Sequence, residues 1–366
     1  MNSMAQGLVS WLRNREAGRP FEAFQIEVTS RCNLRCVMCP VTVLAERWPA
    51  IDLAWETFER IAVAFDKVKW VHLQGWGEPL LHRRMFDMIA RAKAAGCRVG
   101  FTTNGTRLTP STGERLLELG LDVLAVSIAG ASAGTHEAIR AGSDFAKLLE
   151  NVQGFLALRA ARGSATPKVE LLFLMTRTNL AELPDAVELA ARLGADELVA
   201  TNLDYVITPQ LDELRAYSLS PDARVLRETM DRARAVAKQK GLAFRPYPLQ
   251  AREMAVCDLN PLKILFISAD GWVSPCVYTA VTGQREFPRF HDGQMLEIPS
   301  ERFGNVDERS LMEIWELPAY RAFRRQFAER LLSAAKIAVG GGRAAAAIEV
   351  VPAPEPCRSC PKLYGL

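Results

Sequence analysis

The sequence lacks the features that mark a membrane protein, an exported protein or a nucleic-acid-binding protein. No apolar run approaches the ~18 uninterrupted residues of a membrane-spanning helix. The first 20 residues contain three arginines and no long apolar stretch, unlike a signal peptide. Lys and Arg number 45 against 42 Asp and Glu, so the net charge of +3 supplies no strong field for nucleic acid or a membrane. We therefore expect a cytoplasmic protein that binds neither.

Histidine is also scarce, which excludes the familiar helical zinc motifs. The four histidines, at positions 72, 82, 136 and 291, include no pair spaced i,i+4. Apolar residues make up 49% and charged residues 24% of the 366 residues, a composition that excludes a disordered, collagen-like or coiled-coil chain. This length allows about two domains and one sizeable core.

Residues 24–203 alternate short apolar runs with amphipathic helical segments, such as 55–65, 83–96 and 183–194. Nearly continuous apolar strands separated by helices predict a parallel sheet with helices outside. A complete eightfold barrel needs ~250 residues, so this length predicts an incomplete one, with its site at the C-terminal strand ends. The expected strands are Phe24–Val28, Trp70–Leu73, Arg98–Thr102, Val123–Ile128, Val169–Leu174 and Leu198–Thr201.

The pattern changes after a predicted helix at 221–240. Residues 264–276 predict a hairpin with a type I′ turn at Asp270–Gly271. Residues 311–332 predict a helix kinked at Pro318, and the Ala-, Gly- and Pro-rich residues 333–356 predict a linker. We expect four regions: an N-terminal extension (1–23), the α/β barrel (24–205), a helical connection (206–250) and a small C-terminal α+β domain (251–366).

Eight cysteines carry most of the chemical information. In a reducing cytosol, closely spaced cysteines are more often metal ligands than disulfides. Cys32, Cys36 and Cys39 follow the first strand with the spacing C-x3-C-x2-C. Three thiolates can hold three irons of a cubane and leave the fourth iron open. The alternatives are three unpaired thiols or a zinc site, although the loop offers zinc no fourth ligand and the nearest histidine is His72.

This loop resembles that of the radical SAM enzymes, in which it follows the first strand of a partial (β/α)6 TIM-like barrel. The resemblance implies that S-adenosylmethionine (SAM) chelates the open iron of a [4Fe–4S] cluster. Reduction by a protein such as flavodoxin or ferredoxin would then release methionine and a 5′-deoxyadenosyl radical that abstracts a substrate hydrogen. The family usually has an aromatic residue where this chain has Met38, whose backbone is expected to contact adenine.

Segments after the second, third and fourth strands resemble the SAM-contacting segments of the family. Taken alone, LQGWGEPLL and TTNGTRL are also ordinary turn signals. In HEAIR (136–140), the arginine either reaches the SAM carboxylate or is a solvated helix charge. The implied SAM-binding residues are Met38, Gly75, Gly77, Glu78, Pro79, Thr103, Asn104, Ser127 and Arg140. Further candidates near strand ends are Trp76, Glu170, Asn202, Asp204 and Tyr205.

The second set begins with Cys257-x13-Gly271-x4-Cys276, which resembles the SPASM auxiliary-cluster domain. With Cys357 and Cys360 it supplies four thiolates, enough for one auxiliary [4Fe–4S] cluster, as in the shortened twitch version of that domain. A zinc ribbon suits two pairs of cysteines equally well. Cys97 stands alone and is expected to be a small buried apolar residue.

The resemblance implies a radical SAM oxidoreductase or maturase. Its substrate would be a peptide or protein-bound cofactor, or a small sugar or cyclitol, modified by oxidation, epimerisation or cross-linking. The ending CRSCPKLYGL (357–366) also resembles maturases associated with tungsten oxidoreductases. The alternative is a non-catalytic iron–sulfur or zinc protein that transfers electrons or senses a signal.

Overall fold

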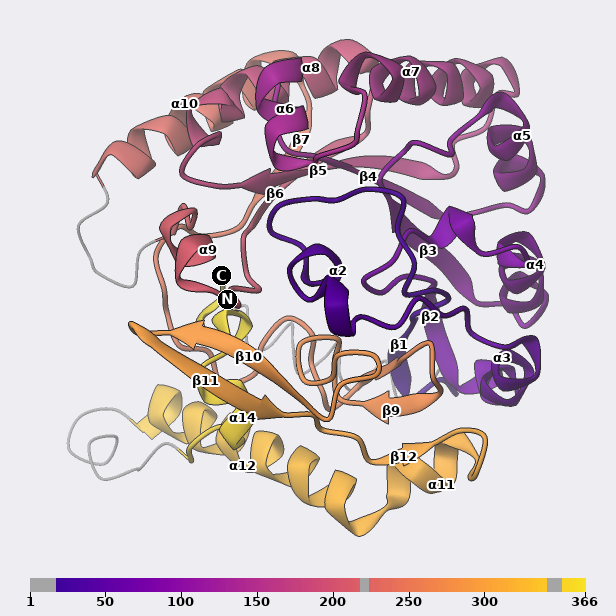
Figure 1. Cartoon of the computed structure of the whole chain (residues 1–366), viewed down its shortest axis with the longest axis vertical. Coiled ribbons are helices and arrows are strands. Elements are labelled where there is room, and N and C mark those ends of the chain that lie inside the picture. Colours follow the sequence, from indigo (N-terminus) through magenta and orange to yellow (C-terminus); the bar gives the residue numbers. More distant parts are fainter. Residues whose placement is uncertain (1–17, 218–223, 341–350) are drawn as a thin grey trace.

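The protein is built around one curved, mainly parallel sheet (Figure 1). The structure, a computed structural model, describes residues 18–217, 224–340 and 351–366. Six strands lie in chain order, each parallel to the next, which confirms the predicted incomplete barrel. They are β1 (Phe21–Ile26), β2 (Val68–His72), β3 (Arg98–Thr103), β4 (Val123–Ile128), β5 (Lys168–Met175) and β6 (Glu197–Asn202).

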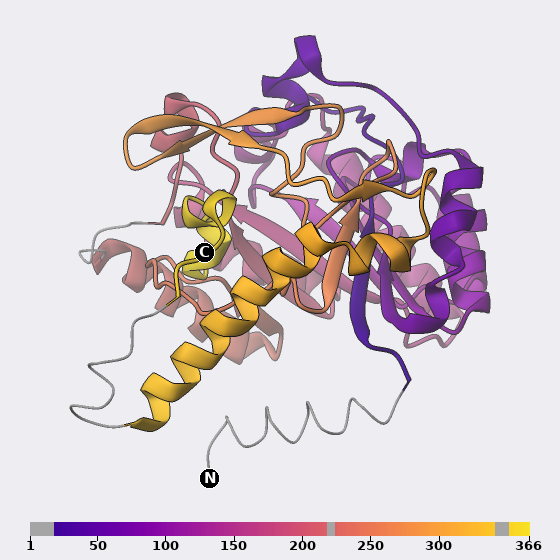
Figure 2. The same ribbon diagram turned by 90° about the horizontal axis from the view of Figure 1, so that it is seen from below.

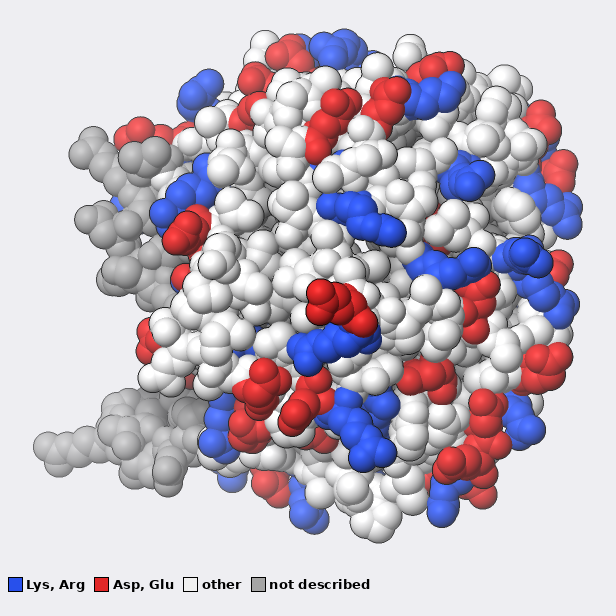
Figure 3. All heavy atoms as spheres, viewed as in Figure 1, with Lys and Arg blue, Asp and Glu red and all other residues white. Residues whose placement is uncertain are grey.

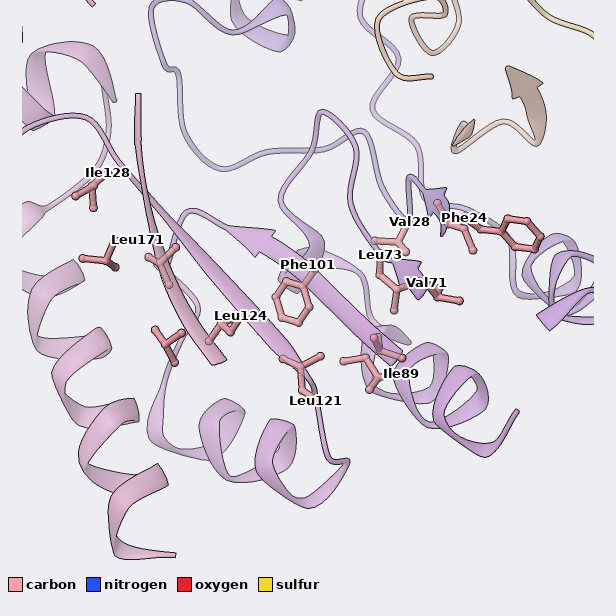
Figure 4. Close-up of a cluster of buried hydrophobic side chains, with 14 of the residues drawn as sticks. Phe24, Val28, Val71, Leu73, Ile89, Phe101, Leu121, Leu124, Ile128 and Leu171 are labelled. Atoms are coloured by element: carbon pink, nitrogen blue, oxygen red, sulfur yellow. The ribbon is translucent and has the colours of Figure 1, made fainter. Parts of the chain in front are cut away.

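Side-chain alternation along these strands separates an apolar core from a polar lumen. Phe24, Phe101 and Leu124 are buried and pack toward the outer helices, together with Ile89 of a covering helix (Figure 4). Since successive side chains of a strand point to opposite faces, the residues between them face the barrel interior. Burial of these large side chains accounts for the stability of the sheet.

The helices that follow the strands cover the outside of the sheet (Figure 1). α8 shows why these segments become helices: Pro184 occupies the first turn, Val187 and Ala190 are buried, and Gly194 ends the helix with a φ of +82°. The covering helices are α3 (Trp55–Ala62), α4 (Met85–Ala94), α5 (Pro110–Glu118), α6 (Ala133–Ile139), α7 (Phe145–Ala161), α8 (Leu183–Leu193) and α10 (Arg224–Lys240).

The sheet is longer than predicted at both ends. β7 (Ala243–Pro246) pairs in parallel with β6, so the predicted helical connection 206–250 contains a strand as well as α9 (Pro209–Glu213) and α10. Sequence patterning missed β7 because it has four residues and no buried face. At the other end, β8 (Ile264–Ile267) pairs in parallel with β1, and β9 (Trp272–Ser274) and β12 (Gly304–Asn305) follow it.

The C-terminal region contains a separate hairpin of β10 (Glu286–His291) and β11 (Gln294–Pro299). Below it run α11 (Leu311–Glu316), the long α12 (Pro318–Gly340) and α14 (Glu355–Arg358) (Figures 1 and 2). This small domain beside the barrel agrees with the predicted architecture. None of the helices within the described ranges has the length and apolar character needed to cross a bilayer.

Four local predictions need correction. The predicted hairpin is present, but Gly271 has a positive φ and Asp270 does not, so its turn is not type I′. Pro318 separates two helices rather than kinking one, because it begins α12. Of the predicted linker, 333–340 belongs to α12 and 341–350 lies outside the described residues. In the predicted extension, 1–17 is likewise outside them and 21–23 belongs to β1.

Candidate active site

The loop after β1 brings Cys32, Cys36 and Cys39 to one cavity at the C-terminal end of the barrel. The end of α6 holds this loop in place: the Val37 amide donates to the Ile139 carbonyl at 3.0 Å. Cys39 precedes the short helix α2 (Pro40–Val43), which turns the chain across the barrel mouth (Figure 1). The three thiols therefore face the same space, although their loop has no regular structure before α2.

Burial disfavours ionisation of the thiols of Cys32 and Cys39. Burial, with a contribution from the neighbouring Cys36, raises the pKa of the Cys39 thiol to about 12. Burial likewise raises the pKa of Cys32. The Arg140 guanidinium opposes this shift at Cys39, and its Nη1 lies 4.0 Å from the Cys36 sulfur. Thiols in such a site lose their protons most readily when a metal centre binds them, because the metal supplies the compensating positive charge.

The cavity has a volume of about 330 Å³, within the range of small-molecule sites. All of the predicted SAM-binding residues except Pro79 line it. Pro79 instead begins a short 3₁₀ helix and is buried beside the cavity. The predicted residues at the cavity are Cys32, Cys36, Met38, Cys39, Gly75, Gly77, Glu78, Thr103, Asn104, Ser127 and Arg140.

Further cavity residues were not predicted from the sequence. Gln25 and Thr102 are inward-facing positions of strands whose other residues are mostly apolar, as Ser127 is on β4. A polar residue at an alternate position within an apolar strand was the available signal. Val277 and Tyr278 carried no such signal, because they come from the C-terminal half of the chain and fold over the barrel mouth. Gln74 and the previously considered Trp76 complete the lining.

Gly75 and Gly77 serve the packing of the protein itself. A Cβ at Gly75 would lie 2.3 Å from Cγ of Glu27, and one at Gly77 would lie 2.3 Å from the Thr29 carbonyl oxygen. The sequence pattern predicted close approach to a ligand here. The contacts show that the backbone after β2 first needs glycine to pass the end of β1.

Two buried carboxylates fix the loops around the cavity. Glu27 accepts hydrogen bonds from the Trp76 amide at 2.9 Å, the Ala269 amide at 3.1 Å and the Thr282 hydroxyl, and so joins β1 to the hairpin of β8 and β9. Burial raises the pKa of Glu27. Glu27 was not predicted as a site residue, because in the sequence it is one polar position at the end of an apolar strand.

Glu78 holds the loop after β3 in a similar way. Its carboxylate accepts from the Thr103 hydroxyl and the Asn104 amide, each at 2.7 Å. Burial raises the pKa of Glu78. The Asn104 side chain in turn donates to Asn33 at 2.9 Å, within the cysteine loop. Glu78 thus determines where Thr103, Asn104 and the cysteine loop lie relative to one another.

Two buried donors at the cavity have no partner within the described residues. These are the indole Nε1 of Trp76 and the Nε of Arg140. A buried donor without a partner costs free energy, so both atoms favour an acceptor supplied by a ligand. Arg140 caps the end of α6 and points into the site, which distinguishes it from a solvated helix charge.

The second set of cysteines converges from three parts of the chain. Cys357 and Cys360 are buried, and burial raises the pKa of Cys257 to about 12 and of Cys276 to about 11. The pKa of Cys357 is raised by burial and then by the other three thiols. Within the described residues, no group of three or more His, Cys, Asp or Glu side chains is arranged so that it could hold a single metal ion.

A short chain of contacts connects the two sets of cysteines. Tyr278, two residues after Cys276, lines the cavity and packs edge-on against Trp76 at 6.0 Å between ring centroids. Its hydroxyl donates to Asp204 at 2.9 Å. Asp204 pairs at 2.6 Å with the ammonium group of Lys362, two residues after Cys360. The wall of the cavity is therefore also the wall of the second site.

Of the remaining candidates, Tyr205 packs against Trp76 with ring centroids 4.8 Å apart, and the others do not line the cavity. Asn202 is buried and donates to the Pro248 carbonyl at 2.8 Å. Glu170 lies near the start of β5, not its end, and pairs with Lys168 at 3.0 Å, so its predicted place at the site is wrong. Cys97 is buried and its thiol donates to the Phe65 carbonyl at 3.2 Å, as expected of a structural residue.

A larger cavity of about 1100 Å³ lies away from the three thiols. It is lined by residues of the segment 245–258, by Ala334 and by Tyr364 and Gly365. No cysteine lines this cavity. A large volume alone does not make a reaction site, because the reaction needs groups such as the cysteine thiols. We therefore place the candidate active site in the smaller cavity.

Two protein families match the chain. The radical SAM superfamily matches residues 26–190, and the SPASM iron–sulfur cluster-binding domain matches residues 257–339. The first match contains the C-x3-C-x2-C loop and strands β2 to β5. The second contains Cys257 and Cys276 and ends before Cys357.

Curated relatives and solved structures cover most of the chain. It is 29% identical over 305 residues to the tungsten-containing aldehyde ferredoxin oxidoreductase cofactor-modifying protein of Pyrococcus furiosus, with 82% of each chain covered. It is 27% identical over 312 residues to the AdoMet-dependent heme synthase of Methanosarcina barkeri, covering 79% of this chain and 80% of the relative. The structure of Streptococcus suis SuiB bound to S-adenosylmethionine has a TM-score of 0.62 at 16% identity, covering 86% of this chain and 70% of SuiB. This last likeness shows a shared fold.

Proposed function

Because this chain belongs to the radical SAM superfamily and carries a C-terminal SPASM iron–sulfur domain, we propose that it is a maturase that cleaves SAM in the smaller cavity and modifies a peptide or a cofactor precursor. The observation that carries the proposal is the convergence of three thiols and two unpartnered donors on one cavity. Membership of this enzyme family argues against the alternative, a non-catalytic iron–sulfur or zinc protein.

The residues present fit a cubane with SAM beside it. Cys32, Cys36 and Cys39 would hold three irons, and a reduced cluster bound there supplies the electron that divides SAM into methionine and a 5′-deoxyadenosyl radical. Arg140 and the indole of Trp76 supply donors that suit the SAM carboxylate. The electron would come from a flavodoxin- or ferredoxin-like protein.

The other cavity residues orient and enclose the ligand. Gln25, Thr102 and Ser127 line one wall with amide and hydroxyl groups that suit a ribose. Glu78 keeps Thr103 and Asn104 in place instead of presenting a free carboxylate. Tyr278 and Val277 cover the opening and limit access of water to the reacting hydrogen.

For the substrate, the relatives favour a peptide or cofactor precursor over a free sugar or cyclitol. The Pyrococcus furiosus relative is a cofactor-modifying protein, and SuiB is also known bound to its precursor peptide SuiA, a structure with a TM-score of 0.60 to this chain. The face that carries α2 has interspersed Lys, Arg, Asp and Glu and no large field of one sign (Figure 3). Such a face suits recognition by shape and hydrogen bonds more than attraction of a highly charged polymer.

The second set of cysteines would hold one auxiliary [4Fe–4S] cluster. Four thiolates complete the coordination of a cubane and leave no open iron, so this centre would accept the electron that leaves an oxidised substrate. Anaerobically reconstituted protein should then contain about eight irons and eight sulfides. Stoichiometric zinc with about four irons would instead make the second site a zinc site.

The catalytic proposal is tested with reduced, reconstituted protein and SAM. Wild-type protein should release 5′-deoxyadenosine, and Cys36→Ala should release none while losing about four irons. Cys97→Ala is the matched control, since that cysteine belongs to neither set and should leave both quantities unchanged. Formation of 5′-deoxyadenosine by Cys36→Ala at the wild-type rate would contradict the proposal.

A further inference from the structure

Arg289 is a buried cation beside the second set of cysteines. Arg289 lies on β10 and is only 2% exposed. The guanidinium donates to the Pro356 carbonyl at 2.5 Å, the Ser359 hydroxyl at 3.1 Å and the Tyr278 carbonyl at 2.7 Å. Pro356 and Ser359 each precede a cysteine of the set, and Tyr278 lies two residues after Cys276. One side chain therefore holds the segments that carry three of the four thiols.

The charge of Arg289 has no carboxylate partner among the residues that the structure describes: its hydrogen bonds go to neutral oxygens. Lys362, another buried cation in this region, differs because Asp204 compensates it at 2.6 Å. Removing an unpaired guanidinium from water is costly, and Arg stays charged at any ordinary pH. The nearby groups able to compensate it are the thiols. Two of its hydrogen-bond acceptors, Pro356 and Ser359, are the residues directly before Cys357 and Cys360.

We propose that Arg289 is the positioning residue and permanent counter-charge of the auxiliary metal centre, and that it makes this centre easier to reduce. The inference deepens the proposed function, since it assigns a residue to the electron-accepting role of the second site. A cubane ligated by four thiolates gains one negative charge when it takes up one electron. A fixed positive charge stabilises that reduced form more than the oxidised form, and net charge and hydrogen bonds are what set such potentials.

The charge and the hydrogen bonds of Arg289 separate in two variants. Arg289→Lys keeps the charge but loses the planar fork, whereas Arg289→Gln keeps a donor and removes the charge. Both are made in the full chain carrying Cys32→Ala, Cys36→Ala and Cys39→Ala, so that only the auxiliary centre is loaded. Iron content and the midpoint potential are measured by a redox titration followed by electron paramagnetic resonance. Arg302→Gln is the matched control: Arg302 is a partly buried arginine of the same region that donates to the Val281 carbonyl at 3.0 Å.

Arg289→Gln should bind about four irons but lower the equilibrium constant for reduction about tenfold, a shift of about 59 mV for a one-electron couple. Arg289→Lys and Arg302→Gln should stay within a third of that shift. Equal potentials for Arg289→Gln and the parent would overturn the proposal. So would equal lowering in the Lys and Gln variants, because the hydrogen-bond geometry would then be the cause.

Loss of the centre from both variants, with circular dichroism unchanged, would also overturn the counter-charge and leave Arg289 a purely structural clamp. If Arg289→Lys retained the centre and Arg289→Gln lost it, the result would support the counter-charge, because a positive charge alone would then be enough to keep the anionic centre bound. The experiment needs no SAM cleavage. Failure of the proposed catalytic function would appear as absent 5′-deoxyadenosine in the wild-type chain and would leave this result unaffected.

Discussion

The two cysteine sites of this protein are assembled in opposite ways. Cys32, Cys36 and Cys39 come from one loop, and their thiols border a cavity of about 330 Å³. The four cysteines of the second site come from three distant segments, and Cys357 and Cys360 are buried. A cation lies beside each set. At the first it is Arg140, whose Nε has no partner in the part of the chain that the structure describes, and at the second it is Arg289, which is hydrogen-bonded to the surrounding backbone.

This difference matches a division of labour between ligand exchange and electron transfer. A metal centre that does chemistry keeps an open coordination position, whereas a fully ligated centre can only transfer electrons or stabilise the fold. At the first site, the cation still has a donor to offer a ligand. At the second, the guanidinium donates three hydrogen bonds to the protein, so its main role there is to supply charge.

We expect the largest effect from a double substitution that removes the second site alone. Cys357→Ala/Cys360→Ala should still cleave SAM but should form oxidised product only at background level, since the electron has no acceptor. Product and 5′-deoxyadenosine are quantified by chromatography, together with about four irons remaining per chain. Normal product at a normal rate would refute the electron-acceptor role, and loss of secondary structure in circular dichroism would favour a structural role instead.

Gly77→Ala should damage the first site and spare the second. The new Cβ would lie 2.3 Å from the Thr29 carbonyl and 2.6 Å from the Arg31 carbonyl, so the backbone beside the cysteine loop must move. We expect a loss of about 3 kcal/mol in the free energy of urea unfolding and fewer irons at the first site.

Gly154→Ala provides the control for this change. Gly154 lies inside α7 with nothing within 4 Å of an added Cβ. This substitution should stabilise the protein by about 0.5–1 kcal/mol, because alanine restricts the unfolded chain. If Gly77→Ala were as well tolerated as Gly154→Ala, the close approach between the loop after β1 and the loop after β2 would not matter.

Glu78→Gln should weaken SAM binding while cluster content is kept. An amide cannot accept from both the Thr103 hydroxyl and the Asn104 amide as the carboxylate does, so the loop after β3 should shift. We expect the dissociation constant of SAM, measured by calorimetry, to rise about tenfold, equivalent to about 1.4 kcal/mol. Glu182→Gln is the control: its carboxylate also holds a loop, through the Ala131 amide at 2.7 Å, but outside the cavity. An unchanged affinity in Glu78→Gln would contradict the positioning role.

The smallest effect concerns the pH dependence of Glu27. Burial, with a contribution from Asp270, raises the folded-state pKa of Glu27 above its ordinary value of 4.5. The stabilisation by the protonated group is complete below 4.5 and is lost as the pH rises through the raised value. Wild type should therefore exceed Glu27→Gln in unfolding free energy by more at pH 5 than at pH 8. A gap of the same size at both pH values would show that the ionisation of Glu27 is not coupled to folding.

The sequence alone determined the barrel strands, because their burial is a periodic property of consecutive residues. All six predicted strands exist, and β4 has its predicted ends at Val123 and Ile128. It also determined the family, since the spacing of Cys32, Cys36 and Cys39 is local. β7 escaped prediction because four residues with no buried face carry no pattern, and its strand form depends on pairing with β6.

Only the tertiary structure showed what several residues of the two sites do there. Gly75 and Gly77 resemble ligand-binding glycines in sequence, yet their contacts are with the segment that follows β1. The roles of Glu27, Tyr278 and Arg289 could not be inferred from local sequence, because each acts on residues far along the chain: Thr282, Asp204 and Pro356. A hydrogen bond between residues brought together by folding leaves no trace in the spacing of either, whereas ligands that share one loop do.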